Sequence, residues 1–272
     1  MDLWQAALLG LVEGLTEYLP VSSTGHLLLT QRALELPADA DSNAFAICIQ
    51  LGAILAVFAL YRRRILQAFL GLAGRHADGR RLLLNLVVAF FPAAVIGVIF
   101  DDRIERHLFG LWPVVVAWAA GGLFLLWLAR RRLGEGGLSL EQLSLRAAAI
   151  IGLCQCIAMW PGVSRSLATI AGGLLCGLGF GAAIEFSFLL GLLTLSAATV
   201  YKGVQQGASL VEHFGPASLL LGLSVAFLSA WLSVRWMVRS LNARTLAGFG
   251  IYRLALALLV AGLLFAGVLE SA

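Results

Sequence analysis

Six long apolar runs constrain this 272-residue chain more than any other feature. They lie at about residues 44–60, 82–100, 111–129, 182–200, 217–238 and 246–268. A helix rises about 1.5 Å per residue, so about 20 apolar residues cross a hydrocarbon layer of about 30 Å. Hydrophobic residues make up 60% of the chain and charged residues 12%, which exceeds what a soluble core absorbs. We therefore expect an all-α polytopic membrane protein with six transmembrane helices.

Two further apolar stretches are too short to cross a membrane. One covers residues 3–12 and stops at Glu13, and the other covers residues 147–159 and stops at Pro161. Each is followed by a polar cluster and another short apolar run, a pattern typical of a helical hairpin that enters the membrane and returns. Broken helices are tolerated at membrane depth only where protein or a water-filled cavity satisfies the freed backbone groups. We expect two re-entrant helical hairpins, with a cavity at each tip.

The basic residues predict the orientation. The formal charge is +4, but the basic residues form short clusters between apolar runs, so we expect no nucleic acid partner. Most arginines lie near residues 61–81, 130–146 and 235–244, on one predicted face, which the positive-inside rule makes cytoplasmic. Both termini and the mouth of the first hairpin then face outward, and the second hairpin enters from the cytoplasm. We expect no cleavable signal peptide, because the N-terminal residues carry no positive leader.

An internal repeat accompanies this pattern. The residues from Gly10 to Ser22 parallel those from Gly152 to Ser164, at an offset of 142 except at the prolines. The chain then divides into residues 1–140 and 141–272, each with one hairpin and three spans, inside a single integral membrane domain. An odd number of spans inverts the second copy, and inverted-topology repeats place their site near the midplane, where the tips meet. Chance similarity between apolar segments is the alternative.

Two carboxylates end the first short run. Glu13 and Glu17 are four residues apart, so they project from one face of a helix. A carboxylate inside a membrane is costly and two on one face repel, so we expect them to share a proton or hold a cation. The alternative is that both reach the outer headgroup region. We favour the first interpretation, because about half a bilayer of helix precedes them.

Polar clusters follow both short runs. The first cluster contains Ser22, Ser23, Thr24, Gly25 and His26. Hydroxyl groups cap a helix start, where exposed N–H groups suit a phosphate. Capping alone would explain the hydroxyl groups, but not the imidazole or the preceding glutamates.

In the second cluster, Arg165 lies between Ser164 and Ser166, with Thr169 one turn later. Arg165 is the basic residue of the two tips, and its planar fork matches phosphate oxygens. A salt bridge to Glu13 or Glu17 is the alternative, and the two roles could alternate with substrate. Polar residues within the spans, ranked lower as supporting partners, are Asn85, Glu185 and Arg253.

Residues 13–26 closely resemble the first signature of the undecaprenyl-diphosphate phosphatase family, the bacitracin-resistance proteins, and residues 161–166 resemble the second. The likeness extends along nearly the whole chain, including residues 50–52, 185–188 and 251–253. One departure is Leu167, where the family usually has glycine. The resemblance implies hydrolysis of undecaprenyl diphosphate to undecaprenyl phosphate and inorganic phosphate, recycling the carrier for peptidoglycan synthesis and conferring bacitracin resistance. It also implies a bacterial inner-membrane location with an outward-facing site.

The resemblance further implies a divalent cation, Mg or Ca, as cofactor. The partners expected are the polyprenyl diphosphate and membrane lipids, and a homodimer is left open. Glu13 and Glu17 would hold the cation or move protons, and Arg165 would clamp the diphosphate. The residues expected to bind substrate are Ser22, Thr24, Gly25, Ser164, Ser166 and Thr169.

The nucleophile stays open: Ser23 attacks, a water attacks with His26 as base, or His26 attacks directly. A secondary transporter is the rival class, because inverted repeats with broken helices are common there. Such a protein needs ligands for its cargo, whereas carboxylates with Ser, His and Arg form a hydrolytic set.

Overall fold

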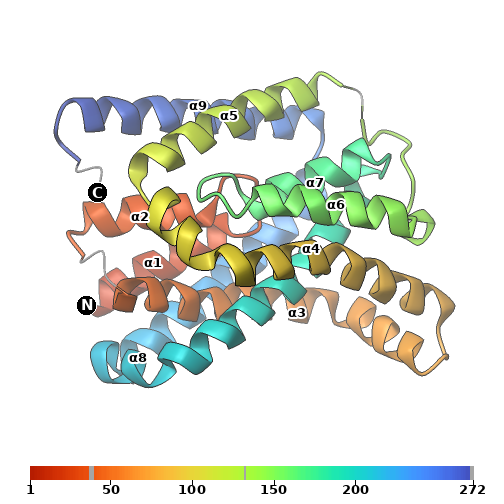
Figure 1. Ribbon diagram of the computed structural model, residues 1–272, viewed down its shortest axis with the longest axis horizontal. Coiled ribbons are helices and arrows are strands. Elements are labelled where there is room, and N and C mark those ends of the chain that lie inside the picture. The colour runs from red at the N-terminus through yellow and green to blue at the C-terminus, as the bar shows by residue number, and fades with distance from the viewer. Residues whose placement is uncertain (37–39, 132, 270–272) are drawn as a thin grey trace.

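The computed structural model describes residues 1–36, 40–131 and 133–269, apart from the side chains of residues 40–43, 101, 102, 105, 106 and 202–213. The α-helices are α1 (Leu3–Thr16), α2 (Ser23–Ala33), α3 (Ala40–Leu72), α4 (Ala77–Leu108), α5 (Leu111–Ala129), α6 (Leu145–Ile157), α7 (Arg165–Leu175), α8 (Phe180–Ser240) and α9 (Ala243–Phe265) (Figure 1). A short 3-10 turn, η1, covers Leu140–Gln142. Within these described ranges the only β-type pairing is one isolated bridge between Leu138 and Leu178. The all-α prediction is confirmed.

Six helical segments are long and apolar enough to cross a membrane, as predicted. They are Ala44–Leu72, Ala77–Phe100, Leu111–Ala129, Phe180–Tyr201, Phe214–Ser240 and Ala243–Phe265. The first continues well past the apolar run that ends at Leu60, through a kink at Tyr61, because arginine favours helix as much as leucine does. The chain is a multi-pass membrane protein.

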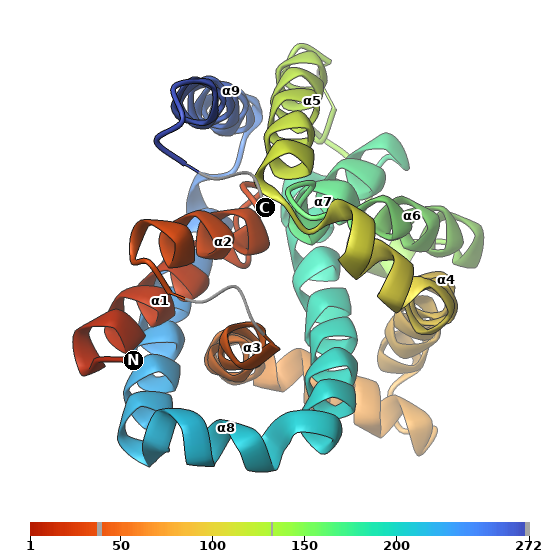
Figure 2. The ribbon, with the colours of Figure 1, turned by 60° about the vertical axis from the view of Figure 1, so that its left-hand side comes forward.

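The fourth and fifth spans are joined by helix and not by a loop. Helix α8 runs for 61 residues and leaves helical geometry at Gly215, where φ is 73° and ψ is 155°. Glycine adopts this positive φ without a Cβ clash, and Pro216, which follows, has no N–H to lose. Figure 2 shows α8 as two limbs joined by a helical crosspiece. The two predicted spans, residues 182–200 and 217–238, are therefore both found, and the segment between them is helical as well.

The two short runs form helical hairpins. Helices α1 and α6 contain 14 and 13 residues, and each is joined by a short turn to an 11-residue helix, α2 or α7. A helix of 14 residues is only about 21 Å long, too short to cross a membrane. Their geometry is compatible with the re-entrant hairpins expected from the sequence.

The two hairpins have equivalent helix starts and equivalent glycine contacts with neighbouring helices. Helix α2 begins at Ser23 and α7 begins at Arg165, which preserves the 142-residue offset found in the sequence. A Cβ on Gly10 of α1 would lie 2.3 Å from the carbonyl oxygen of Gly222 in α8, and a Cβ on Gly152 of α6 would lie 2.4 Å from that of Ala89 in α4. Small residues permit such close helix contacts within membranes. The division at residue 140 stays a prediction.

Candidate active site

The turns of the two hairpins share an unusual backbone conformation. Ser22 and Ser164 have φ of 75° and 79°, in the left-handed region that non-glycine residues rarely adopt. Each residue caps the following helix, because its Oγ accepts the N–H of Gly25 or Leu167, at 3.4 and 3.2 Å. Such strain persists where the surrounding structure enforces it, often at functional sites. Both serines therefore cap the helices that follow them, as the sequence suggested for Ser22.

Three of the hydroxyls predicted to bind phosphate hold the second hairpin in place. Ser166 Oγ donates to the carbonyl oxygen of Leu19 at 2.8 Å, and Ser164 Oγ reaches the same oxygen at 3.4 Å. Thr169 Oγ1 lies 2.6 Å from Ser187 Oγ of α8. Ser166 and Thr169 are completely buried. In this conformation Ser164, Ser166 and Thr169 are engaged with protein, and their contact with phosphate stays a prediction.

The two hairpins meet at Glu17. Its Oε1 accepts a hydrogen bond from Arg165 Nη2 at 2.9 Å, and its Oε2 accepts one from Ser23 Oγ at 2.5 Å. All three side chains are largely buried. The prediction that the tips meet is confirmed, and the salt bridge considered for Arg165 is formed. We call Glu13, Glu17, Ser23 and Arg165 the central cluster.

The guanidinium of Arg165 is enclosed on several sides. It lies 5.1 Å from the ring centroid of Tyr18, and Nη1 donates to the carbonyl oxygen of Ser187 at 3.0 Å. A Cβ on Gly191 would lie 2.0 Å from Nη1, so only glycine leaves room for it. Nε is buried and has no hydrogen-bond partner among the described residues. One donor of the fork therefore has no hydrogen-bond partner among the described residues in this conformation.

Glu13 lies one turn before Glu17 and is 1% exposed. Its Oε1 is buried without a hydrogen-bond partner among the described residues. These residues contain no group of three or more His, Cys, Asp and Glu side chains arranged to hold a metal ion. Mg²⁺, however, is often held by one or two protein carboxylates together with substrate phosphates. Glu13 and Glu17 fit that partial ligand set.

His26 belongs to a separate aromatic cluster. Its Nδ1 lies 2.7 Å from the carbonyl oxygen of Ser22, and since a carbonyl only accepts, Nδ1 carries the proton. In the neutral ring, Nε2 then accepts from the Tyr252 hydroxyl at 2.7 Å. The ring stacks on Tyr252 and meets the edge of Trp118. None of the described hydrogen bonds joins His26 to Ser23.

The remaining predicted residues of the first hairpin differ in exposure. Thr24 is exposed, and no described hydrogen bond involves its side chain. Gly25 is buried, and a Cβ there would lie 2.6 Å from the Trp118 ring. Trp118 in turn donates its indole N–H to the carbonyl oxygen of Val21 at 3.0 Å. Gly25 thus permits the close approach of α5 that fixes the first turn.

Arg253 of α9 donates hydrogen bonds to backbone carbonyls of both hairpin turns. It is completely buried. Its Nη2 donates at 2.8 Å to the carbonyl oxygens of both Ala117 and Gly162, and its Nη1 donates at 3.2 and 3.1 Å to those of Pro20 and Val163. No carboxylate pairs with it among the described residues. Arg253 is therefore a cation that joins the first turn, the second turn and α5.

The other two polar residues ranked with Arg253 lie elsewhere. Glu185 pairs with Arg64 at 2.5 Å, and Asn85 donates to the carbonyl oxygen of Leu143 at 3.0 Å.

The sequence alone assigned no role to Tyr18, Ser187 or Tyr252, which contact Arg165 or His26. All three lie in runs that resemble the family, so that likeness was the available signal.

Fold and site together define a multi-pass membrane protein in which two broken-helix hairpins meet at a buried carboxylate, serine and arginine cluster. The sequence profile described as bacitracin resistance protein BacA matches residues 6–259, and the chain belongs to this family. An undecaprenyl-diphosphatase of Sorangium cellulosum is 45% identical over 94% of this chain and 85% of its own length. Undecaprenyl-diphosphatase 1 of Chromobacterium violaceum is 42% identical over 98% of both chains.

Proposed function

We propose that this protein hydrolyses undecaprenyl diphosphate to undecaprenyl phosphate and inorganic phosphate. The observation that carries the proposal is the chain of contacts from Ser23 through Glu17 to Arg165, which supplies a hydroxyl, a base and an anion clamp. The printed names of the relatives support the substrate. Phosphoryl transfer depends mainly on positioning and charge stabilisation, which such a buried cluster provides.

Ser23 is the proposed nucleophile. Its Oγ donates to Glu17, so this carboxylate can take the serine proton as Oγ attacks the terminal phosphorus. The bond from that phosphorus to the bridging oxygen breaks, and the lipid monophosphate leaves with the proton from Glu17. Water then attacks the phosphorus of the phosphoserine and gives a proton to Glu17. The bond from that phosphorus to Ser23 Oγ breaks, Glu17 returns the proton to Oγ, and inorganic phosphate leaves. His26 is a weaker candidate, because its Nε2 is engaged by Tyr252.

Arg165 is the proposed clamp. Its free Nε can bind a phosphate oxygen while Nη2 still holds Glu17. A second phosphate oxygen would compete with Glu17 for Nη2, which would free the carboxylate for proton transfer. Arginine forms such paired contacts with phosphate because its donors lie in one plane. Arg165 would then alternate between an ion pair with Glu17 and paired hydrogen bonds to phosphate.

Glu13 and Glu17 are the residues that would hold the proposed divalent cation. A bound cation would neutralise charge on the diphosphate oxygens. Glu13 Oε1, buried and without a partner, is the atom best placed to gain from a cation or a proton. Glu13 therefore has an electrostatic role beside the Ser23 and Glu17 pair.

In the cell, the proposed site faces outward from the bacterial inner membrane, with both hairpins re-entrant. This orientation rests on the arginine distribution of the sequence. The reaction would return the lipid carrier to peptidoglycan synthesis and confer bacitracin resistance, in keeping with the family description. The test is inorganic phosphate release from undecaprenyl diphosphate by the purified protein in detergent with Mg²⁺ or Ca²⁺. No release with either cation would contradict the proposal.

A further inference from the structure

Side chains hold four consecutive carbonyl oxygens of the turn that leads into Ser23. These are the oxygens of residues 19, 20, 21 and 22. Their side-chain donors, in that order, are Ser166, Arg253, Trp118 and His26, at 2.8, 3.2, 3.0 and 2.7 Å. Most backbone carbonyls in proteins are satisfied by other backbone groups, so four side-chain donors in a row indicate a turn whose shape is fixed by its surroundings.

The donor that bears most directly on Ser23 is His26. The Ser22 carbonyl and the Ser23 N–H belong to one planar trans peptide group, so the hydrogen bond that holds the carbonyl also sets the orientation of Ser23. The left-handed backbone of Ser22 costs about 1–3 kcal/mol and persists only where neighbouring groups enforce it. Rotation of this peptide group would move Ser23 Oγ away from Glu17, to which it donates at 2.5 Å.

Tyr252 holds His26 in the tautomer that this contact requires. Its hydroxyl donates to Nε2 at 2.7 Å, so the ring proton stays on Nδ1, which donates to the Ser22 carbonyl. The two rings also stack, with centroids 5.7 Å apart and planes 7° apart. Tyr252 lies near the middle of the α9 span, where lipid offers no competing hydrogen-bonding group. Both nitrogens of His26 are therefore engaged, and neither is available to accept a proton.

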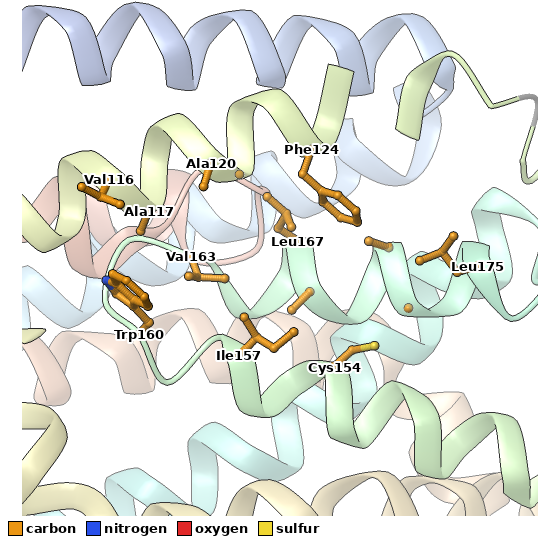
Figure 3. A pocket seen from close by; sticks show the side chains of 14 residues that line it. Val116, Ala117, Ala120, Phe124, Cys154, Ile157, Trp160, Val163, Leu167 and Leu175 are labelled. Atoms are coloured by element: carbon orange, nitrogen blue, oxygen red, sulfur yellow. The ribbon is translucent and has the colours of Figure 1, made fainter. Parts of the chain in front are cut away.

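The second hairpin shows that such a turn forms without a histidine. Ser164 has a φ of 79° and caps α7, as Ser22 caps α2. The residue 142 positions after His26 is Ala168, which lines an apolar hollow of about 330 Å³ between α5, α6 and α7 (Figure 3). Among the described residues, the Ser164 carbonyl accepts the backbone N–H of Ala168 and no side chain. The imidazole is thus confined to the hairpin that carries Ser23, which favours a role in placing Ser23 over a role in forming the turn.

We propose that Tyr252 is a positioning residue, which acts through His26 and the Ser22 carbonyl on Ser23. This inference rests on the proposed function, in which Ser23 is the nucleophile. It makes His26 a holder of the turn and not a base. Neither Tyr252 nor His26 would touch the diphosphate, so changes in the pair should lower kcat and leave KM unchanged.

Two substitutions of His26 separate holding the turn from proton transfer. The side-chain nitrogen of asparagine stands where Nδ1 stands, so His26→Asn can still donate to the Ser22 carbonyl. The nitrogen of glutamine stands where Nε2 stands, and neither amide can take up a proton. His26→Asn should keep most of kcat, whereas His26→Gln should lose about 100-fold, the scale of a 1 Å misplacement. An equal loss in both variants, or a greater loss in His26→Asn, would overturn the proposal.

Tyr252→Phe removes one oxygen atom and keeps the stacked ring, so it tests the pair even if a His26 variant fails to fold. We expect kcat to fall about tenfold, the scale of one lost hydrogen bond. The same exchange in a His26→Asn background should have no further effect, because no tautomer is left to set. Tyr201→Phe, at an exposed tyrosine of α8 without a described hydrogen bond, is the matched control and should change nothing. Unchanged kcat in Tyr252→Phe, or the same loss in both backgrounds, would overturn the proposal.

The tautomer can be measured without turnover. In protein labelled with nitrogen-15 histidine, the NMR signals that are absent from His26→Asn belong to His26. They should show a protonated Nδ1 and an unprotonated Nε2 in the unmodified protein, and a mixture of tautomers in Tyr252→Phe. A proton on Nε2 in the unmodified protein would overturn the proposal. The proposed function fails separately, if the unmodified protein releases no phosphate from undecaprenyl diphosphate.

Discussion

Arg165 of the second hairpin donates to Glu17 of the first across 2.9 Å, in an ion pair whose two side chains are 11% and 5% exposed. The residues are 148 positions apart, so neither hairpin completes the site alone. Removing one partner of a buried pair leaves the other charge unpaired, which costs about 3–5 kcal/mol. The same contact therefore contributes to stability and positions Glu17, the proposed catalytic base.

Arg165→Lys keeps the charge and loses the planar fork, so we expect turnover to fall about 100-fold, the scale of a lost charge-stabilising donor. Arg165→Ala should lose nearly all turnover and also lower the melting temperature, because Glu17 is left unpaired. Steady-state turnover and thermal unfolding of both purified variants check this. Full activity in Arg165→Lys would remove the clamp role and leave a structural salt bridge.

Glu17→Gln should reduce turnover by about 100-fold or more while the protein still folds, because an amide cannot take the serine proton. Glu35→Gln is the matched control, because it makes the same carboxyl-to-amide exchange at an exposed residue just after the same hairpin. It should retain near-normal turnover. Near-normal turnover in Glu17→Gln would remove Glu17 from the mechanism.

Gly121→Ala tests the support that Arg253 gives to both turns. A Cβ at position 121 would lie 2.3 Å from Arg253 Nη2, whereas a Cβ at Gly248 meets nothing within 4 Å. Gly121→Ala should destabilise the protein by about 1–3 kcal/mol, the usual cost of overpacking, and lower kcat. Gly248→Ala should change neither. Equal behaviour of the two variants would show that Arg253 is not held in this position.

The orientation predicts which loops a membrane-impermeant thiol reagent reaches in intact cells. In a chain whose four cysteines are replaced, Arg75→Cys, in the exposed turn after α3, should stay unlabelled. Phe109→Cys, in the turn between α4 and α5, should be labelled. Labelling in the opposite pattern would invert the topology and place the first hairpin on the cytoplasmic side.

The sequence predicted the spans, both hairpins and the Glu17, Ser23 and Arg165 cluster, because apolar length, turn residues and helix spacing are local properties. Contacts between residues that are far apart in the chain could not be predicted from the sequence. The contact from His26 to Tyr252 joins residues 226 positions apart, and only packing brings them together. The sequence predicted spans that end at residue 200 and begin again at residue 217 but not what joins them, and α8 continues through residues 201–213, since glutamine and alanine favour helix.

The hydrogen-bond partners of the hydroxyl groups in the second hairpin could not be predicted from the sequence either. Ser166 lies in the second signature beside Arg165 and Thr169 follows three residues later, and the residue types of both suit phosphate. The structure engages them with Leu19 and Ser187. A hydroxyl that binds protein and one that binds phosphate look alike in sequence, so the sequence could not predict the contacts with Leu19 and Ser187, and the contact with phosphate stays a prediction.

The most direct measurement is an acid quench of the purified protein during turnover of undecaprenyl diphosphate, followed by mass spectrometry of the peptide that contains Ser23. Phosphoserine survives acid, whereas phosphohistidine does not. The account predicts one phosphoryl group on Ser23, absent from Ser23→Ala, which should also release no phosphate. An active Ser23→Ala variant would contradict Ser23 as the nucleophile and indicate attack by water or His26.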